Sequence, residues 1–206
     1  MATTTPNYGW SVPTSSDYVA QGAVAIETLG DSVDASLFSI TGGKNVGYQY
    51  ISSASFSGAS TVNVDNVFTS AYKSYVLYIY ATGSASAGIR LQYLKATVPR
   101  AANYYGGLLY SAFTGGSGQV PMSNVNQATL GTIGTSGSYT RVDIGDPMLT
   151  SGASNSTYLL FQNMYAAGGE HTVGGVSVAS DTYDGFRLTT STGTMTGSVR
   201  IYGIRN

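Results

Sequence analysis

The chain of 206 residues contains no cysteine. This absence excludes disulfides and thiolate metal ligands, so stability must come from packing and assembly. Charged residues are also scarce, at 9% of the chain against about 25% in an average soluble domain. No apolar run approaches the roughly 18 residues that would indicate a membrane span. We expect no membrane insertion, no cofactor and no metal.

The few charges are unevenly distributed along the chain. Residues 1–43 carry four acidic and no basic groups, a sum of −4, whereas residues 44–206 carry nine basic and six acidic groups, a sum of +3. Neither part is basic enough to indicate nucleic-acid binding. The opening MATTTPNYGW lacks the basic and apolar stretches of a secretory signal. A protein of this kind that acts outside a cell would be released by lysis.

Glycine and tyrosine are abundant, with 27 and 17 copies, and apolar residues make up 42% of the chain. That apolar content is sufficient for a core and is atypical of a disordered chain. From about residue 44 the pattern alternates with period two, as in YKSYVLYIYATG, which places Tyr75, Leu77 and Ile79 on one face. About nine or ten such segments, separated by Gly, Ser and Asn clusters, predict an antiparallel, jelly-roll-like β-sandwich over residues 41–206.

One helix is predicted before the sandwich, over residues 17–40, with Ser16 or Asp17 as its N-cap. Its small and apolar residues recur at steps of four and three, which is the spacing of a helical seam. The predicted oligomer seam consists of Val19, Ala23, Ile26, Gly30, Val33 and Leu37. Two uses of this stripe remain open: association into a homotrimer, or docking of the helix on its own β domain.

The only tryptophan, Trp10, lies in residues 1–16, between Pro6 and Pro13. The prolines predict an extended arm with few alternative conformations, which lowers the entropy lost when the arm docks on a partner. Tryptophan is a frequent anchor of protein interfaces. We therefore predict that Pro6, Tyr8, Trp10 and Pro13 attach the chain to a partner, or that Trp10 packs at the base of a trimer.

Residues that could support catalysis are few. His171 stands beside Glu170 in a glycine-rich stretch, and two acidic pairs, Asp143 with Asp146 and Asp181 with Asp184, lie in the sequences DIGDP and DTYDG. Two carboxylates could serve a glycosidase. Asp before Gly or Pro is equally typical of turns, and no phosphate loop or nucleophile elbow is present. We therefore expect a protein that is not an enzyme, with no catalytic residues.

A binding role is better supported by the sequence PRAANYYGGLLY, which places Arg100, Tyr104 and Tyr105 close together. A tyrosine ring can stack on a sugar, and its hydroxyl can form hydrogen bonds with the sugar's hydroxyls. These three residues are the predicted glycan-binding site. The alternative is that the tyrosines pack in the core or in an interface.

The chain resembles bacteriophage virion proteins at both ends. TPNYGWSVPTSSDYVAQGAVAIETLGDSVDASL is similar to the N-terminal segment of tail-fibre and other appendage proteins, and TGTMTGSVRIYGIRN resembles the last strands of small phage β-sandwich proteins. The resemblance covers about the first 40 and the last 20 residues. It implies attachment to other virion proteins through residues 1–16, with Tyr8 and Trp10 as anchor, and a trimer with Val19, Ile26, Val33 and Leu37 near its axis.

The resemblance implies a short tail fibre or receptor-binding appendage that is assembled in the host cytoplasm and presents its sandwich to host surface glycans. Long fibres have a shaft between helix and β domain, which this chain lacks. Two alternatives remain at this point: a capsid decoration protein held by the same arm, and a polysaccharide depolymerase.

Overall fold

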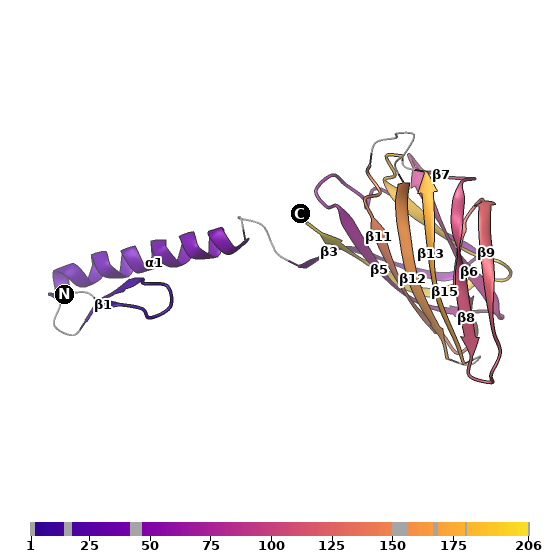
Figure 1. The fold of residues 1–206 in the computed structure, drawn as a ribbon, viewed down its shortest axis with the longest axis horizontal. Coiled ribbons are helices and arrows are strands. Elements are labelled where there is room, and N and C mark those ends of the chain that lie inside the picture. Colours follow the sequence, from indigo (N-terminus) through magenta and orange to yellow (C-terminus); the bar gives the residue numbers. More distant parts are fainter. Residues whose placement is uncertain are drawn as a thin grey trace. The chain divides into compact units, whose positions relative to one another are not determined.

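The computed structural model describes residues 3–14, 18–41, 47–149, 156–166, 169–179 and 181–205. The chain divides into two compact units, Met1–Val46 and Gly47–Asn206, whose elements are labelled in Figure 1. The first unit holds one helix, and the second is built from antiparallel sheets. This confirms the predicted fold class, a mainly β protein with one helix.

The first unit is a short β-hairpin followed by a helix. Strands β1 (Thr3–Thr4) and β2 (Ser11–Val12) pair antiparallel, and helix α1 spans Val19–Thr41. The helix agrees with its predicted range, and its predicted caps Ser16 and Asp17 lie outside the described residues. The hairpin corrects the prediction of an extended arm, because the chain turns back on itself between the two prolines.

Local hydrogen bonds explain why the arm turns. The Thr5 N–H donates to the Trp10 carbonyl at 2.9 Å, and the Gly9 N–H donates to the Thr5 carbonyl at 3.0 Å. The Trp10 N–H also donates to the Thr5 hydroxyl at 3.0 Å. Gly9 has a φ of +67°, a left-handed conformation that glycine adopts without steric cost. The hydrogen bonds of Thr5 and the left-handed backbone of Gly9 therefore specify this loop. The prediction of an extended arm considered only the two prolines.

Helix α1 has one side next to the hairpin and another that is exposed. The Trp10 indole Nε1 donates to the Ser36 hydroxyl at 3.1 Å, and Leu29, on the same side of the helix, is half-buried. The predicted seam lies about a quarter-turn away. There Ile26 is 63% exposed and Leu37 is 57% exposed, Ala23 is exposed and Val33 is half-buried. The tryptophan thus contacts its own helix and leaves most of the predicted seam accessible.

The second unit contains two sheets whose strands all pair antiparallel. The five-stranded sheet has the order β10 (Ala128–Ile133), β6 (Ala87–Lys95), β14 (Gly185–Thr190), β4 (Thr61–Val64), with β7 (Val98–Pro99) also pairing with β6. The eight-stranded sheet has the order β3 (Tyr48–Ala59), β15 (Met195–Ile204), β5 (Ser74–Gly83), β11 (Ser138–Gly145), β12 (Ser156–Tyr165), β13 (Glu170–Ala179), β8 (Tyr104–Ala112), β9 (Ser117–Val125).

The strand order combines a jelly-roll frame with two insertions. Strands β3, β15, β5 and β11 form one half of the frame and β4, β14, β6 and β10 the other, and consecutive frame strands change sheets at every step except from β6 to β10, which pair with each other. The hairpin β8–β9 is inserted between β6 and β10, and β12–β13 between β11 and β14. Both insertions join the eight-stranded sheet beyond β11, where β13 pairs with β8 (Figure 1).

The core lies between the sheets and follows the period-two pattern. Tyr75, Leu77 and Ile79 of β5, which were predicted to share one face, are all buried, and so are Ile89 and Leu91 of β6. Strand β10 packs across β12 and β13, so the inserted strands are covered on their inner face as well. Within the described part of the β unit, no second sheet packs on the opposite face of the eight-stranded sheet.

A stack of tyrosines occupies one end of the core. The Tyr93 ring lies parallel to Tyr183, with centroids 4.6 Å apart, and also stacks on Tyr104 at 6.5 Å. The Tyr104 hydroxyl accepts a hydrogen bond from the Tyr93 N–H at 2.7 Å. Burial raises the pKa of both Tyr93 and Tyr104. The two hydroxyls in this apolar site therefore differ in their hydrogen bonding. The Tyr104 hydroxyl has a hydrogen-bond partner, whereas no described residue pairs with the Tyr93 hydroxyl.

This difference gives a matched pair of stability tests. Tyr104→Phe should lower the free energy of unfolding by about 1–3 kcal/mol, because it leaves the Tyr93 N–H buried without its acceptor. Tyr93→Phe removes a buried hydroxyl that no described residue pairs with and should leave stability unchanged or raised. Chemical denaturation of both variants measures the difference. Equal losses in the two would contradict this assignment of the hydroxyls.

Candidate functional site

The outer face of the eight-stranded sheet carries a groove over the two insertions. One hollow of about 420 Å³ lies over β8, β9 and β13, and a second of about 400 Å³ lies over β11, β12 and β13. Both include Val173 and Gly174, so we treat them as one groove. Its outward-facing lining consists of Gly107, Leu109, Gln119, Pro121, Arg141, Asp143, Leu160, Gln162, Val173 and Gly175.

Glycines on neighbouring strands form the floor of the groove. Gly175 of β13 pairs with Gly107 of β8, so two adjacent outward positions carry no side chain. A Cβ added to Gly175 would meet the flexible end of Leu160 at 3.1 Å, which can move aside. A Cβ on Gly174, which faces inward, would approach the Phe161 ring and the Gly107 carbonyl closely. Gly174 is therefore required for packing, whereas the groove's depth depends on Gly175 and Gly107.

Polar side chains line one wall of the groove. The Arg141 Nη2 donates to Asp143 Oδ1 at 2.7 Å and its Nε to Oδ2 at 3.0 Å, a forked ion pair between neighbouring outward positions of β11. This contact raises the pKa of Arg141. Gln162 lies beside Arg141 in the strand register. The wall therefore presents oriented donors and acceptors, with Leu109, Leu160 and Pro121 as apolar surface around them.

The predicted glycan-binding residues do not form one site. Tyr104 is 0% exposed and belongs to the core stack, so a glycan role for it is wrong. Tyr105 is its neighbour on β8 and points outward, with 46% of its surface exposed. Arg100 donates to the Ala102 carbonyl and lines a smaller hollow of about 230 Å³ with Lys95 and Tyr183. Adjacent strand residues face opposite sides of a sheet, which separates Tyr104 from Tyr105.

The first acidic pair is divided between two cations. Asp143 binds Arg141, as described above, whereas an Asp146 oxygen lies 3.9 Å from the Lys73 ammonium. Asp146 also has a φ of +43°, a conformation that Asp adopts in turns. The prediction that DIGDP forms a turn therefore holds for Asp146, whereas Asp143 lines the groove.

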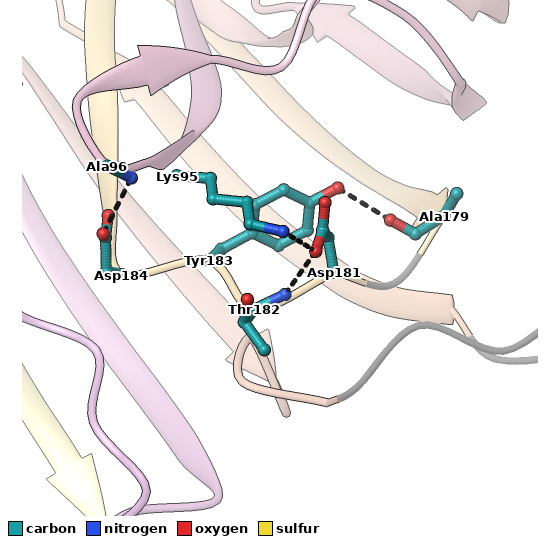
Figure 2. A network of polar contacts seen from close by, with 7 residues as sticks. All are labelled: Lys95, Ala96, Ala179, Asp181, Thr182, Tyr183 and Asp184. Atoms are coloured by element: carbon teal, nitrogen blue, oxygen red, sulfur yellow. Dashed lines mark hydrogen bonds and ion pairs between the residues drawn. The ribbon is translucent and has the colours of Figure 1, made fainter.

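The second acidic pair holds a strained turn, as Figure 2 shows. Lys95 Nζ lies 2.5 Å from Asp181 Oδ1, which also accepts from the Thr182 N–H at 2.8 Å. The Ala96 N–H donates to Asp184 Oδ2 at 2.8 Å. Ala96 and Thr97 have φ values of +48° and +70° between β6 and β7, where the two-residue turn usually carries Asn or Gly.

The Lys95 ammonium holds the pKa of Asp181 below its ordinary value. Because the folded-state pKa is lower than the unfolded one, the resulting stability is present above the unfolded-state pKa and is lost as the pH falls through the folded-state pKa. Asp181→Asn should cost up to about 1 kcal/mol at neutral pH, since Lys95 is half-exposed. The difference in unfolding free energy between wild type and variant, measured by urea denaturation, should disappear at acidic pH. A gap that persists at every pH would contradict the ion pair's role.

The single histidine lies on a strand of the eight-stranded sheet. His171 is half-buried on β13, opposite Met164 and Ser111. Its neighbour Glu170 accepts hydrogen bonds from the hydroxyls of Thr132 at 2.9 Å and Thr172 at 3.2 Å. Within the described ranges, no three His, Asp or Glu side chains gather as metal ligands would. Within the same ranges, no helix is both long enough and apolar enough to cross a membrane.

Comparison with known proteins gave no relative: no protein-family model matches the chain, and no curated protein matches it.

Sequence reasoning missed the groove because its residues come from frame strand β11 and from two separate insertions. The Arg141 and Gln162 strands follow each other, but Leu109 and Pro121 come from a hairpin inserted before them. The signal that could have been used is the pair of dipeptides Gly106-Gly107 and Gly174-Gly175, each inside a β-prone segment. Glycine within a strand often marks a place where another molecule or backbone approaches closely.

Proposed function

We propose that the protein is a non-enzymatic bacteriophage structural protein, a short tail fibre or receptor-binding appendage of the virion. Residues 1–16 attach it to other virion proteins, and the β unit binds host surface glycan in the groove. The observation that carries the proposal is the two-unit organisation, in which a helix with an exposed apolar stripe precedes a jelly roll whose insertions form a groove.

The first unit supports attachment and assembly. Tyr8 stacks on Trp10 with ring centroids 5.0 Å apart, and Tyr8 is exposed while Trp10 is half-buried. The anchor we propose is therefore the ring pair on a hairpin, with Tyr8 as its outward member. The exposed side of α1, with Ile26 at its middle, has the spacing that suits a homotrimer.

The groove supports sugar recognition by its chemistry. Ligand sites are concave, with apolar walls and a few oriented polar groups, and their volumes commonly lie between about 300 and 1,000 Å³. The forked Arg141–Asp143 pair and the Gln162 amide can donate to and accept from neighbouring sugar hydroxyls. Leu109 and Leu160 offer apolar surface for the C–H faces of the ring. The groove lies on insertions, and inserted segments commonly carry function on a stable frame.

Filling the groove tests the glycan proposal. Gly175→Val should fold, since the residue is outward on a strand, and should remove binding to bacterial surface polysaccharides on an array because its side chain occupies the floor. Ser177→Val, two residues along the same strand and outside both hollows, is the matched control and should bind as wild type. Array binding that survives in Gly175→Val would exclude the groove as the receptor site.

The position of the protein on the particle tests the virion proposal. Gold-labelled antibodies against residues 47–206 should mark the tail of purified phage particles in electron micrographs. Labelling restricted to the capsid would replace the fibre proposal by a decoration protein. Shortened polysaccharide chains after incubation with the purified protein would show a depolymerase and overturn the non-enzymatic assignment.

A further inference from the structure

The outward-facing residues that line the groove form two rows across the sheet, in which each residue pairs with the next through the strand register. The first row consists of Gln119, Leu109, Val173, Gln162 and Arg141, and the second of Pro121, Gly107, Gly175, Leu160 and Asp143. The rows cross five neighbouring strands from β9 to β11, and four strand spacings of about 4.8 Å give a length of about 19 Å. The groove therefore suits a segment of an extended chain that lies across the strands.

Both rows end on β11 with a charged residue. Of the described residues that line the groove, Arg141 and Asp143 are the charged ones, so the sum of charges along it is zero. Their side chains are 39% and 40% exposed, which lets a ligand in the groove reach both. The Asp143 carboxylate accepts from Nη2 and from Nε of Arg141. It therefore occupies the edge of the guanidinium with which arginine binds a carboxylate in a fork.

We infer that this ion pair makes the groove selective for uncharged polysaccharide, with Asp143 as the residue that determines the selectivity. Asp143 neutralises Arg141 and so excludes acidic chains, which carry uronic acids or other carboxylates. The inference rests on the proposed function, in which the groove binds glycan. It adds the charge class of the ligand and the residue that selects it.

The selectivity follows from the cost of removing water from a charge. A carboxylate of an acidic chain would lose hydration on entering the groove, and only an unpaired cation at close range could offset that loss. Arg141 is already paired, and Asp143 repels a second carboxylate at the same range. The hydroxyls of a neutral chain do not meet this cost, because they can donate to Asp143 and accept from Arg141.

Other charges of the outer face lie further from the groove. Arg200 of β15 lies in the same register row as Arg141, with Tyr78 of β5 between them. Two strand spacings make this separation about 10 Å, which exceeds the Debye length of about 8 Å at physiological ionic strength. His171, the next outward position to Val173 on β13, counts as neutral at pH 7. The Arg141–Asp143 pair is therefore the charge feature that a bound chain meets first.

Replacing Asp143 tests the inference with probes that differ only in charge. Acidic bacterial polysaccharides are printed on an array beside their carboxyl-reduced forms, in which each carboxylate has become a hydroxymethyl group and the linkages are kept. Wild type should bind the reduced forms more tightly than their acidic parents at pH 7 and physiological salt. Asp143→Asn keeps the shape of the side chain and leaves Arg141 unpaired, so it should bind the acidic parents about fivefold more tightly than wild type does.

Asp181→Asn is the matched control for net charge. It removes the carboxylate of the Lys95–Asp181 ion pair, which lies outside both hollows of the groove, and it changes the charge of the chain by the same amount. It should bind both forms as wild type does. An equal gain of acidic binding in Asp181→Asn would show an effect of overall charge and would overturn the inference. A wild type that binds the acidic parents as tightly as the reduced forms would also overturn it.

A second variant carries the opposite change. Arg141→Gln leaves Asp143 as an unpaired negative charge, so binding of the acidic parents should weaken by a similar factor. When Arg141→Gln and Asp143→Asn are combined, the groove again carries no charge and the preference for reduced forms should return. Both side chains are outward and half-exposed, so these variants should fold. Equal binding of the acidic parents by wild type and all three variants would overturn the inference.

Gly175→Val on the same array separates this inference from the proposed function. If Gly175→Val abolishes binding and wild type prefers the acidic parents, the groove binds glycan and the inference alone fails. If wild type binds neither form, or if Gly175→Val binds as wild type does, the proposed receptor site fails and the inference fails with it.

Discussion

The structure depends on the period-two alternation of its long β-strands. Along the inner strands of the eight-stranded sheet, such as β5, β11 and β12, alternate side chains are buried in the core, and the others face outward. A chain with 9% charged residues cannot cover so wide an outer face with lysine and glutamate. Tyrosine, serine and glycine occupy it instead. The low charge content and the sheet geometry together decide the composition of this face.

The two halves of that outer face differ because they come from different parts of the fold. The frame strands β3, β15, β5 and β11 carry bulky tyrosines whose rings fill the surface. The inserted strands beyond β11 carry Gly175 next to Gly107, and there the surface is hollow. One sheet thus carries an aromatic surface and a groove side by side, and the Arg141–Asp143 pair lines the groove on the side of the frame strands.

In the N-terminal unit, the indole N–H of Trp10 has its hydrogen-bond acceptor within the same unit. The hairpin between Thr3 and Val12 brings the Trp10 indole to Ser36, so the indole N–H has a partner within the chain. Trp10 contacts one side of α1, and Ile26, on another side, is exposed. A helix with two apolar sides can contact its own hairpin and another copy at once, so docking and association need not exclude each other.

The sequence alone determined the fold class, the approximate helix range and the shared face of Tyr75, Leu77 and Ile79, because alternation and heptad spacing are local patterns that survive any tertiary arrangement. It grouped Tyr104 with Tyr105 because they are adjacent in the chain. Tertiary structure decided the rest. Only the pairing of β13 with β8, residues separated by more than sixty positions, brings Gly175 to Gly107 and creates the groove. Such long-range pairing depends on which strands close the sheet, and no local pattern encodes it.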